Sequence, residues 1–332
     1  MAGIPYGGIW ENWKSGMVIP FLGAGASISA RVASPLEHWD PDNPTFLPSG
    51  GELARYLASL SDFPSQDDYD RRDLAKVSSY YSEYLGRKGL RSLLRQKVFA
   101  GNPKEGKSLF YTPGKLHKFL AAVPVPQVLV VTNYDTLLEQ AFVAADKPFD
   151  LVVYPAERKD LANCVLWFPH GEVQPKEVAA NELDLDFSTT TVIFKMHGTI
   201  QSETEKWDNL VITEEDYVEF MSRMETAVPC QLKTFFRDRS FLFLGYSLRD
   251  WNLRLIFKNL SKRPAAEPQF SGEDNQRPPS WSIQITPPEF EKKLWAKRNV
   301  EIYECNLNVF AEEMWKCSKL KQVSNEVLVN LT

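Results

Sequence analysis

The sequence has few cysteines, few histidines and no surplus of positive charge. Its 332 residues include four cysteines, and the two closest together, Cys305 and Cys317, lie 12 positions apart. Without a CxxC pair, the sequence predicts neither a zinc knuckle nor a redox dithiol, and we expect the cysteines to be reduced core residues. The formal net charge of −5 argues against a surface that collects nucleic-acid backbones. We therefore expect no metal and no direct nucleic-acid binding.

Long hydrophobic runs are missing as well. The first residues, MAGIPYGGIWENWKSG, contain neither a basic leader nor the apolar run of a signal peptide. The most apolar later stretch, 119–131, is interrupted by Pro124, Pro126 and Gln127. We expect no membrane segment and a cytoplasmic protein. With 43% hydrophobic and 24% charged residues, the composition is that of a folded globular chain.

What is present is a series of short apolar runs bounded by Gly, Pro or Asn, each typical of a buried strand. The runs cover 17–22, 128–131, 151–154, 192–196, 241–244, 282–285 and 300–303. Helical patterns follow several of them, for example at 135–144 and 248–260. Strands that alternate with helices predict an α/β fold with a doubly wound, mostly parallel, Rossmann-like sheet.

The chain has no repeat and no linker between two cores, so we expect one domain over residues 1–332. A helical insertion is predicted at about 51–118, because apolar residues recur there at helical spacing. An irregular insertion is predicted at about 155–191, and a mobile loop rich in Pro and charge at about 261–280.

The first chemical signal is a strand that runs into Gly23-Ala24-Gly25-Ala26-Ser27. Small residues let backbone N–H groups approach a pyrophosphate at the start of a helix. The third glycine of the usual dinucleotide fingerprint is replaced by Ile28, and a tight turn without a ligand is the alternative.

A second signal follows the next predicted strand, which ends at Thr132. Polar side chains at the carboxyl end of a buried parallel strand are typical of the sites of doubly wound proteins. The amide of Asn133 can hold a water or a ribose hydroxyl, and Asp135 supplies a carboxylate. The alternative for Asp135 is a helix cap.

The third signal is His197-Gly198, after the apolar run at 192–196. Histidine is suited to proton transfer near neutral pH. Of the four histidines, we interpret His38 and His117 as packing residues. His170 forms a second His-Gly pair, but we favour His197 because only it ends a convincing strand.

The fourth signal is another strand-to-helix turn, Gly245-Tyr246-Ser247, whose small and hydroxyl side chains suit a phosphate or a ribose edge. All four signals fall where a predicted buried strand gives way to a helix or loop. Because the carboxyl ends of parallel strands share one edge of a sheet, the four segments predict one site.

In order, GAGAS, TNYD followed by LLE, KMHG, ITEEDY and FLGYSLRDWN resemble the sirtuin-like NAD-consuming domain of bacterial phage-defence proteins over roughly residues 18–310. The resemblance implies that the GAGAS loop holds the NAD pyrophosphate, that the Asn of TNYD and the His of KMHG are the catalytic pair, and that the GYS turn lines the ribose and phosphates. Protein-deacylating sirtuins carry a four-cysteine zinc module that this sequence cannot supply, and their GIPDFR-like stretch is unrecognisable in 29–48.

We therefore expect an NAD glycohydrolase that releases nicotinamide and ADP-ribose, with NAD as substrate and no metal. The catalytic residues would be Asn133, His197 and Asp135. The alternatives are an ADP-ribosyltransferase or NAD-dependent deacylase, and a non-catalytic module that senses NAD or ADP-ribose. The resemblance implies an antiviral effector that acts as a homo-oligomer or with a partner such as an Argonaute-like protein or an ATPase.

An unrestrained NAD hydrolase would kill its own host, so we expect the isolated chain to be held inactive. Two segments are predicted to provide this restraint. One is 29–48, and the other is the helical insertion, whose Tyr80, Tyr81 and Tyr84 are expected to pack over the nicotinamide end of the substrate.

Overall fold

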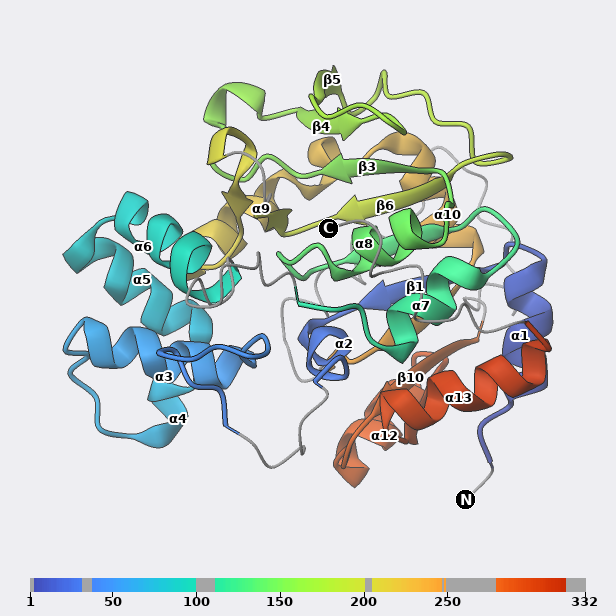
Figure 1. Ribbon diagram of the computed structural model, residues 1–332, viewed down its shortest axis with the longest axis horizontal. Helices are drawn as coiled ribbons and strands as arrows, with labels where there is room; N and C mark the ends of the chain where they lie inside the picture. Colours follow the sequence, from blue (N-terminus) through green and yellow to red (C-terminus); the bar gives the residue numbers. More distant parts are fainter. Residues whose placement is uncertain are drawn as a thin grey trace.

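The structure is a computed structural model that describes residues 3–31, 38–99, 111–200, 205–246, 248 and 279–320. A nine-stranded sheet forms its centre, and a group of helices lies beside one edge of that sheet (Figure 1). Residues 249–278 lie outside the described residues, and with them nearly all of the expected helix at 248–260 and of the expected mobile loop at 261–280; Ser280 itself begins a strand.

All seven apolar runs form strands, as predicted. They are β1 (Val18–Leu22), β2 (Val128–Val131), β3 (Phe149–Val153), β6 (Thr191–Lys195), β9 (Ser240–Leu244), β10 (Ser280–Gln284) and β11 (Val300–Glu304). These strands pair in parallel, and the sheet order is β11-β10-β9-β1-β2-β6-β3-β4-β5. From β1 the chain winds towards β2 on one side and later returns to β9 on the other. The strand order therefore reverses beside β1, which is where doubly wound proteins bind ligands.

The segment at 155–191 contains two strands that extend the sheet. Strand β4 (Cys164–Phe168) pairs antiparallel with β3, and β5 (Lys176–Ala179) pairs antiparallel with β4. Two further short strands, β7 (Gly198–Thr199) and β8 (Asn209–Leu210), form a separate ribbon directly after β6.

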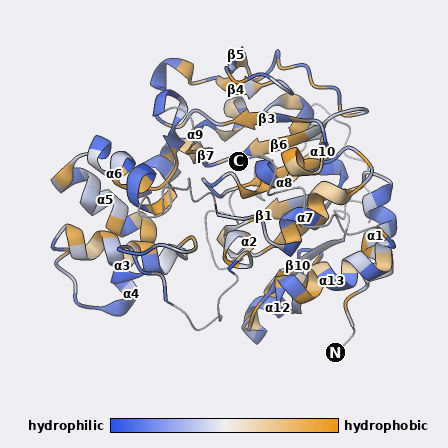
Figure 2. Cartoon of the chain, in the orientation of Figure 1, coloured by the Kyte–Doolittle hydropathy of each residue, from blue (hydrophilic) through white to orange (hydrophobic). Residues whose placement is uncertain are grey.

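Alternating side chains of the central strands build two hydrophobic cores, one on each face of the sheet. In β1, Val18 and Leu22 enter the first core, whereas Ile19 and Phe21 enter the second. Helices α1 (Tyr6–Lys14), α7 (Lys115–Ala122), α8 (Leu137–Ala144) and α13 (Leu307–Ser318) cover the first core. Helices α9 (Glu214–Ala227), α10 (Cys230–Asp238) and α12 (Glu289–Ala296) cover the second. Figure 2 accordingly shows the hydrophobic colour on β1, β3 and β6.

A third core belongs to the helices beside the sheet, which we call the helical lobe (residues 50–99). The lobe comprises α3 (Gly50–Leu60), α4 (Asp68–Arg71), α5 (Leu74–Leu85), α6 (Arg87–Leu93) and a π-helix, η1 (Leu94–Phe99). Its buried residues include Leu57, Val77 and Leu90, and they pack against Ile200 and Ile212 from the segments that follow β6. Helix α7, by contrast, packs on the sheet.

Three short elements complete the described chain: α2 (Ala24–Ile28), η3 (Lys159–Leu161) and η4 (Glu205–Trp207). Among the described residues, no helix is long and apolar enough to span a bilayer. The expectation that the cysteines are core residues is wrong for Cys230, which is exposed at the start of α10. Cys164, Cys305 and Cys317 are partly buried and pack against the first core. All four are free thiols, as expected.

Candidate functional site

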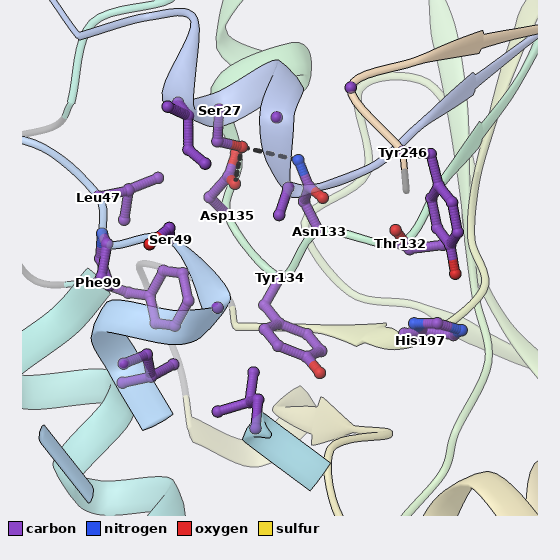
Figure 3. Close-up of a pocket in the computed structure, with 18 of the residues that line it drawn as sticks. Ser27, Leu47, Ser49, Phe99, Thr132, Asn133, Tyr134, Asp135, His197 and Tyr246 are labelled. Carbon is purple, nitrogen blue, oxygen red and sulfur yellow. Dashed lines mark hydrogen bonds between the residues drawn. The ribbon is translucent and has the colours of Figure 1, made fainter. Parts of the chain in front are cut away.

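A cavity of about 470 Å³ lies at the carboxyl ends of β1, β2, β6 and β9, between the sheet and the helical lobe (Figure 3). Each of the four sequence signals contributes to its wall. The residues that line it are Ala24, Gly25, Ser27, Ile28, Leu47, Pro48, Ser49, Gly50, Leu53, Leu74, Phe99, Thr132, Asn133, Tyr134, Asp135, His197, Tyr217, Gly245 and Tyr246. The fold thus brings together segments more than 200 positions apart in the chain, at the point where the strand order reverses.

The turns after β1 and β9 are in direct contact, and this contact requires their glycines. The Gly25 N–H donates to the Gly245 carbonyl at 2.8 Å, and a Cβ at Gly25 would lie 2.7 Å from the Gly245 Cα. Gly245 has φ +66°, and its own Cβ would lie 2.4 Å from the Ala26 nitrogen. Gly23 packs equally closely against Tyr246. The glycines are therefore needed for the two turns to meet, whatever ligand the cavity holds.

The predicted residues of these turns divide between cavity and interior. Ala24, Gly25 and Ser27 reach the cavity wall, whereas Ala26 is fully buried and lies behind it. After β9, Gly245 and Tyr246 line the cavity. Ser247, which we also predicted to bind, lies outside the described residues.

Asn133, Ser27 and Asp135 form one chain of hydrogen bonds at the wall (Figure 3). The Asn133 amide nitrogen donates to the Ser27 hydroxyl at 2.7 Å and to the Gly23 carbonyl at 3.0 Å. The Ser27 hydroxyl donates in turn to the Asp135 carboxylate at 2.6 Å. Because both contacts use the amide nitrogen, the Asn133 amide oxygen is turned away from Ser27 and can accept a hydrogen bond from a ligand.

Asp135 also bonds the start of α8, although Thr136 rather than Asp135 is the N-cap residue. Its second carboxylate oxygen accepts the Leu137 N–H at 3.1 Å at the start of α8. Thr132 fixes the same segment to β1, because both its N–H and its hydroxyl donate to the Leu22 carbonyl, at 3.0 and 3.1 Å. The segment that carries Asn133 is therefore held at both ends.

His197 is nearly completely buried, with 3% of its surface exposed, and it lines the cavity. Tyr217 and Phe220 pack edge-on against its ring, at centroid distances of 5.3 and 5.8 Å. The buried Nε2 has no hydrogen-bond partner among the described residues. Burial lowers the pKa of His197 to about 3, so that the imidazole is neutral at neutral pH. A neutral, unpartnered imidazole at a cavity wall can accept a hydrogen bond from a ligand or water.

The backbone at position 198, directly after His197, can be adopted only by glycine. It has φ +84°, and a Cβ there would lie 2.0 Å from the Asn209 carbonyl oxygen in β8. The close β7–β8 pairing includes a bond from the Val211 N–H to the His197 carbonyl at 2.9 Å, which fixes the backbone of the histidine.

The other histidines lie elsewhere, although His117 is closer to the site than we expected. It is buried in α7, its Nδ1 accepts the Gly114 N–H at 3.2 Å, and its pKa falls to about 4 because of burial, opposed by the charge of Asp135. His38 is exposed, and His170 is exposed in a turn after β4. Neither is among the residues that line the cavity.

The expectation that Tyr80, Tyr81 and Tyr84 cover the site is wrong for the described part of the chain, because none of them lines the cavity. Tyr81 is buried in the lobe's own core, and Tyr80 stacks on the exposed Tyr84 at 4.2 Å. Leu53, Leu74 and Phe99 occupy the wall instead, together with residues 47–50 from the predicted restraint segment and its junction with the lobe.

Tyr134 and Tyr217 also line the cavity, although no role was predicted for them from the sequence. The Tyr134 hydroxyl donates to the Val211 carbonyl at 2.6 Å, and burial raises the pKa of Tyr134 well above its ordinary value. Their position inside the motifs TNYD and ITEEDY was the available signal. Within the described ranges, no group of three or more His, Cys, Asp or Glu side chains is arranged to hold a metal ion.

The sequence is similar to a known domain family and to several characterised proteins. The sequence model of the SIR2-like domain matches residues 127–303, just over half of the chain. An NAD(+) hydrolase ThsA of Enterococcus faecium is 26% identical over 212 residues, which cover 64% of this chain and 35% of that protein. The ThsA of Acinetobacter baumannii (strain 532279) is 28% identical over 196 residues, 58% of this chain and 32% of the relative. Defense-associated sirtuin 2 of Bacillus subtilis is 20% identical over 254 residues, which cover 76% of this chain and 20% of that protein. The chain thus spans between 20% and 35% of the length of these relatives.

Proposed function

The chain belongs to the SIR2-like family, and from that premise we propose that it hydrolyses NAD+ to nicotinamide and ADP-ribose. The observation that carries the proposal is the cavity in which the Asn133–Ser27–Asp135 chain of hydrogen bonds shares a wall with the unpartnered imidazole of His197. Relatives named NAD(+) hydrolase support the choice of substrate.

The reaction breaks the bond between C1′ of the ribose and the nicotinamide nitrogen. The electron pair of that bond leaves with the ring, which becomes neutral, so that no general acid is required. The sugar passes through an oxocarbenium-like state that a water attacks at C1′. The protein must therefore hold the ribose, exclude competing nucleophiles and accept one proton from the water.

Asn133 and His197 suit these tasks. The Asn133 amide oxygen accepts a hydrogen bond from a ribose hydroxyl or from the attacking water, and Ser27 and Gly23 fix the amide in place. The neutral His197 Nε2 accepts the proton of water or of a ribose hydroxyl as positive charge develops on the sugar. Asp135 orients the Asn133 segment through Ser27 and offers a carboxylate to the nicotinamide carboxamide.

The remaining predicted residues would bind the rest of NAD. Ala24 and Gly25 present a compact surface to the pyrophosphate, and Gly23 and Ala26 support that turn from behind. Thr132, Gly245, Tyr246 and Ser247 complete the proposed ribose and phosphate contacts. Leu53, Leu74 and Phe99 offer an apolar surface for one of the two flat rings.

We also propose that the activity is regulated and serves antiviral defence in the cytoplasm, since one relative is named a defense-associated sirtuin. Activation would come from self-assembly or from a partner such as an Argonaute-like protein or an ATPase. Holding 99% of molecules inactive requires only ~2.7 kcal/mol, which a subunit contact can supply.

The test is to incubate NAD+ with the pure chain over a wide range of protein concentrations and to identify the products by mass spectrometry. Nicotinamide and free ADP-ribose in equal amounts are expected, with turnover per chain rising on assembly. ADP-ribose attached to protein would indicate a transferase, acyl-ADP-ribose formed from an added acyl-lysine peptide would indicate a deacylase, and bound, intact NAD+ would indicate a sensor. Any of these three results would refute the hydrolase.

A further inference from the structure

Lys195 is a charged residue in the middle of the protein interior. It is the last residue of β6, and its side chain has no exposed surface. Alternation along β6 places Phe194 in the second core and Ile193 in the first, so Lys195 lies on the same face as Ile193, beneath α8. Burying an ammonium group in this position is costly unless each of its contacts is satisfied.

Two groups accept hydrogen bonds from the Lys195 ammonium, and both belong to the segment that follows β2. The Lys195 ammonium forms an ion pair with Glu139 in the first turn of α8, with an N–O distance of 3.0 Å. It also donates to the backbone carbonyl of Asp135. The carbonyl of Thr136 accepts the first helical bond, from the Gln140 N–H at 2.9 Å, so Lys195 bonds the carbonyl immediately before the helix.

We propose that Lys195 is a positioning residue that fixes the turn carrying Asn133 and Asp135, and that Glu139 holds Lys195 in place. This inference rests on the proposed function and deepens it. Lys195 does not line the cavity, so it acts through the turn rather than on the substrate.

The residues of this turn are attached at separate points. Thr132 is bonded to β1, and the Tyr134 carbonyl accepts the Ile200 N–H at 3.0 Å. The bond from the Leu137 N–H fixes the Asp135 side chain, and Lys195 holds the Asp135 backbone carbonyl. A buried ion pair is rarely more stable than a well-packed apolar pair of the same size. If an apolar pair replaced Lys195 and Glu139, the protein would lose chiefly the hydrogen bond that holds the Asp135 carbonyl.

The experiment compares the full chain with the double variant Lys195→Met/Glu139→Leu, which removes both buried charges together and avoids leaving one unpaired. Lys147→Met is the matched control, because the Lys147 ammonium also donates to a backbone carbonyl, that of Val123 at 2.9 Å, away from the cavity. Thermal stability, ADP-ribose affinity and kcat for NAD+ cleavage are measured for each protein.

The double variant should melt close to the wild type and bind ADP-ribose with similar affinity, whereas kcat falls ~10- to 100-fold because the reacting groups are displaced. Lys147→Met should keep kcat. Wild-type kcat in a double variant of wild-type stability would overturn the proposal.

A second variant keeps the proposal testable if the double variant does not fold. Glu139→Gln gives Lys195 an uncharged partner and leaves the contact with the Asp135 carbonyl. The variant should be less stable than the wild type, because one buried charge loses its opposite charge, but the folded protein should keep a kcat near that of the wild type. If a folded Glu139→Gln protein lost as much kcat as is expected for the double variant, the ion pair rather than the carbonyl contact would determine kcat. That result would overturn the proposal.

Hydrogen exchange separates this inference from the hydrolase proposal. The Leu137 amide, which is bonded to Asp135, should exchange ~10-fold faster in the double variant than in the wild type, at matched global stability. This readout requires no turnover. If the wild type cleaves no NAD+, the hydrolase proposal fails on its own, and unchanged exchange of Leu137 would refute the positioning role separately.

Discussion

The two walls of the cavity are built in different ways. On the sheet side, short polar side chains are fixed by hydrogen bonds to one another and to neighbouring strand ends, as between Asn133 and Ser27. On the lobe side, the wall is apolar, and the lobe is joined to the sheet by partly buried ion pairs such as Arg87–Asp216 and Arg91–Glu157, both at 2.8 Å. The difference indicates that the sheet supplies the chemistry, whereas the lobe supplies shape.

The largest expected effect is on the sheet side. His197→Ala should reduce kcat by ~10²- to 10⁴-fold, because the variant loses the proton acceptor. Assays should use circular dichroism to confirm the fold, since the ring is buried between Tyr217 and Phe220. The matched control is His170→Ala, at an exposed turn. Loss of turnover in the control, with retention in His197→Ala, would move the catalytic role to the other His-Gly pair.

A second prediction concerns the contact between the turns after β1 and β9. Gly25→Ala should destabilise the protein by ~1–3 kcal/mol and lower turnover, because the new Cβ meets the Gly245 backbone. The control is Gly89→Ala in α6, where a Cβ meets no atom within 4 Å. That variant should be up to ~1 kcal/mol more stable, since alanine favours a helix. Denaturant unfolding measures both, and equal effects would contradict the close approach of the two turns.

On the lobe side, Phe99→Ala should raise KM for NAD+ by ~10-fold and change kcat little, because it removes apolar contact area rather than a reacting group. Phe99 ends the π-helix η1 and packs edge-on against Tyr134 at 6.2 Å. The control is Tyr84→Ala, an exposed lobe aromatic away from the cavity. If Phe99→Ala lost kcat instead, the lobe would contribute to the chemistry, and the division between the two walls would be wrong.

The expected effect with the least bearing on turnover is the pH dependence of stability. Burial lowers the pKa of His117 to about 4, so the unfolded chain binds more protons than the folded chain between about pH 4 and the ordinary histidine value. The free energy of unfolding should therefore fall as the pH drops through this window, by up to ~1.4 kcal/mol per pH unit for this group. His117→Asn should flatten the slope, whereas His38→Asn, at an exposed position, should not. Equal slopes in all three proteins would contradict the burial of a neutral His117.

The sequence was sufficient to predict the seven parallel strands of the sheet and the strand ends that form the sheet side of the cavity. Thr132 and His197 each follow an apolar run that forms a strand. Because a parallel sheet brings the carboxyl ends of its strands together, the local sequence pattern is enough to predict that these residues lie close together. The antiparallel strands β4 and β5 were not predicted, because the segment shows no clear period: β4 is buried or half-buried throughout, and β5 begins with two exposed residues.

The lobe side could not be predicted in the same way. Helical periodicity identifies the helices of 50–99, but which face meets the cavity depends on packing between helices that lie far apart in sequence. Tyr80 and Tyr84 have aromatic rings suited to a nicotinamide ring, yet Leu53 and Phe99 are the residues that line the cavity. Lys195 illustrates a detectable signal that was not used: a charge in an apolar strand requires a buried partner, and Glu139 faces it from α8.

The most direct test of the central claim is the fate of solvent oxygen. Active wild-type protein and the His197→Ala variant are given NAD+ in water enriched in oxygen-18, and the released ADP-ribose is weighed by mass spectrometry. We predict that the wild type forms ADP-ribose carrying one oxygen-18 at C1′, together with an equal amount of nicotinamide, and that the variant forms almost none. Unlabelled or protein-bound ADP-ribose from the wild type, or equal labelled product from both proteins, would contradict hydrolysis at this site.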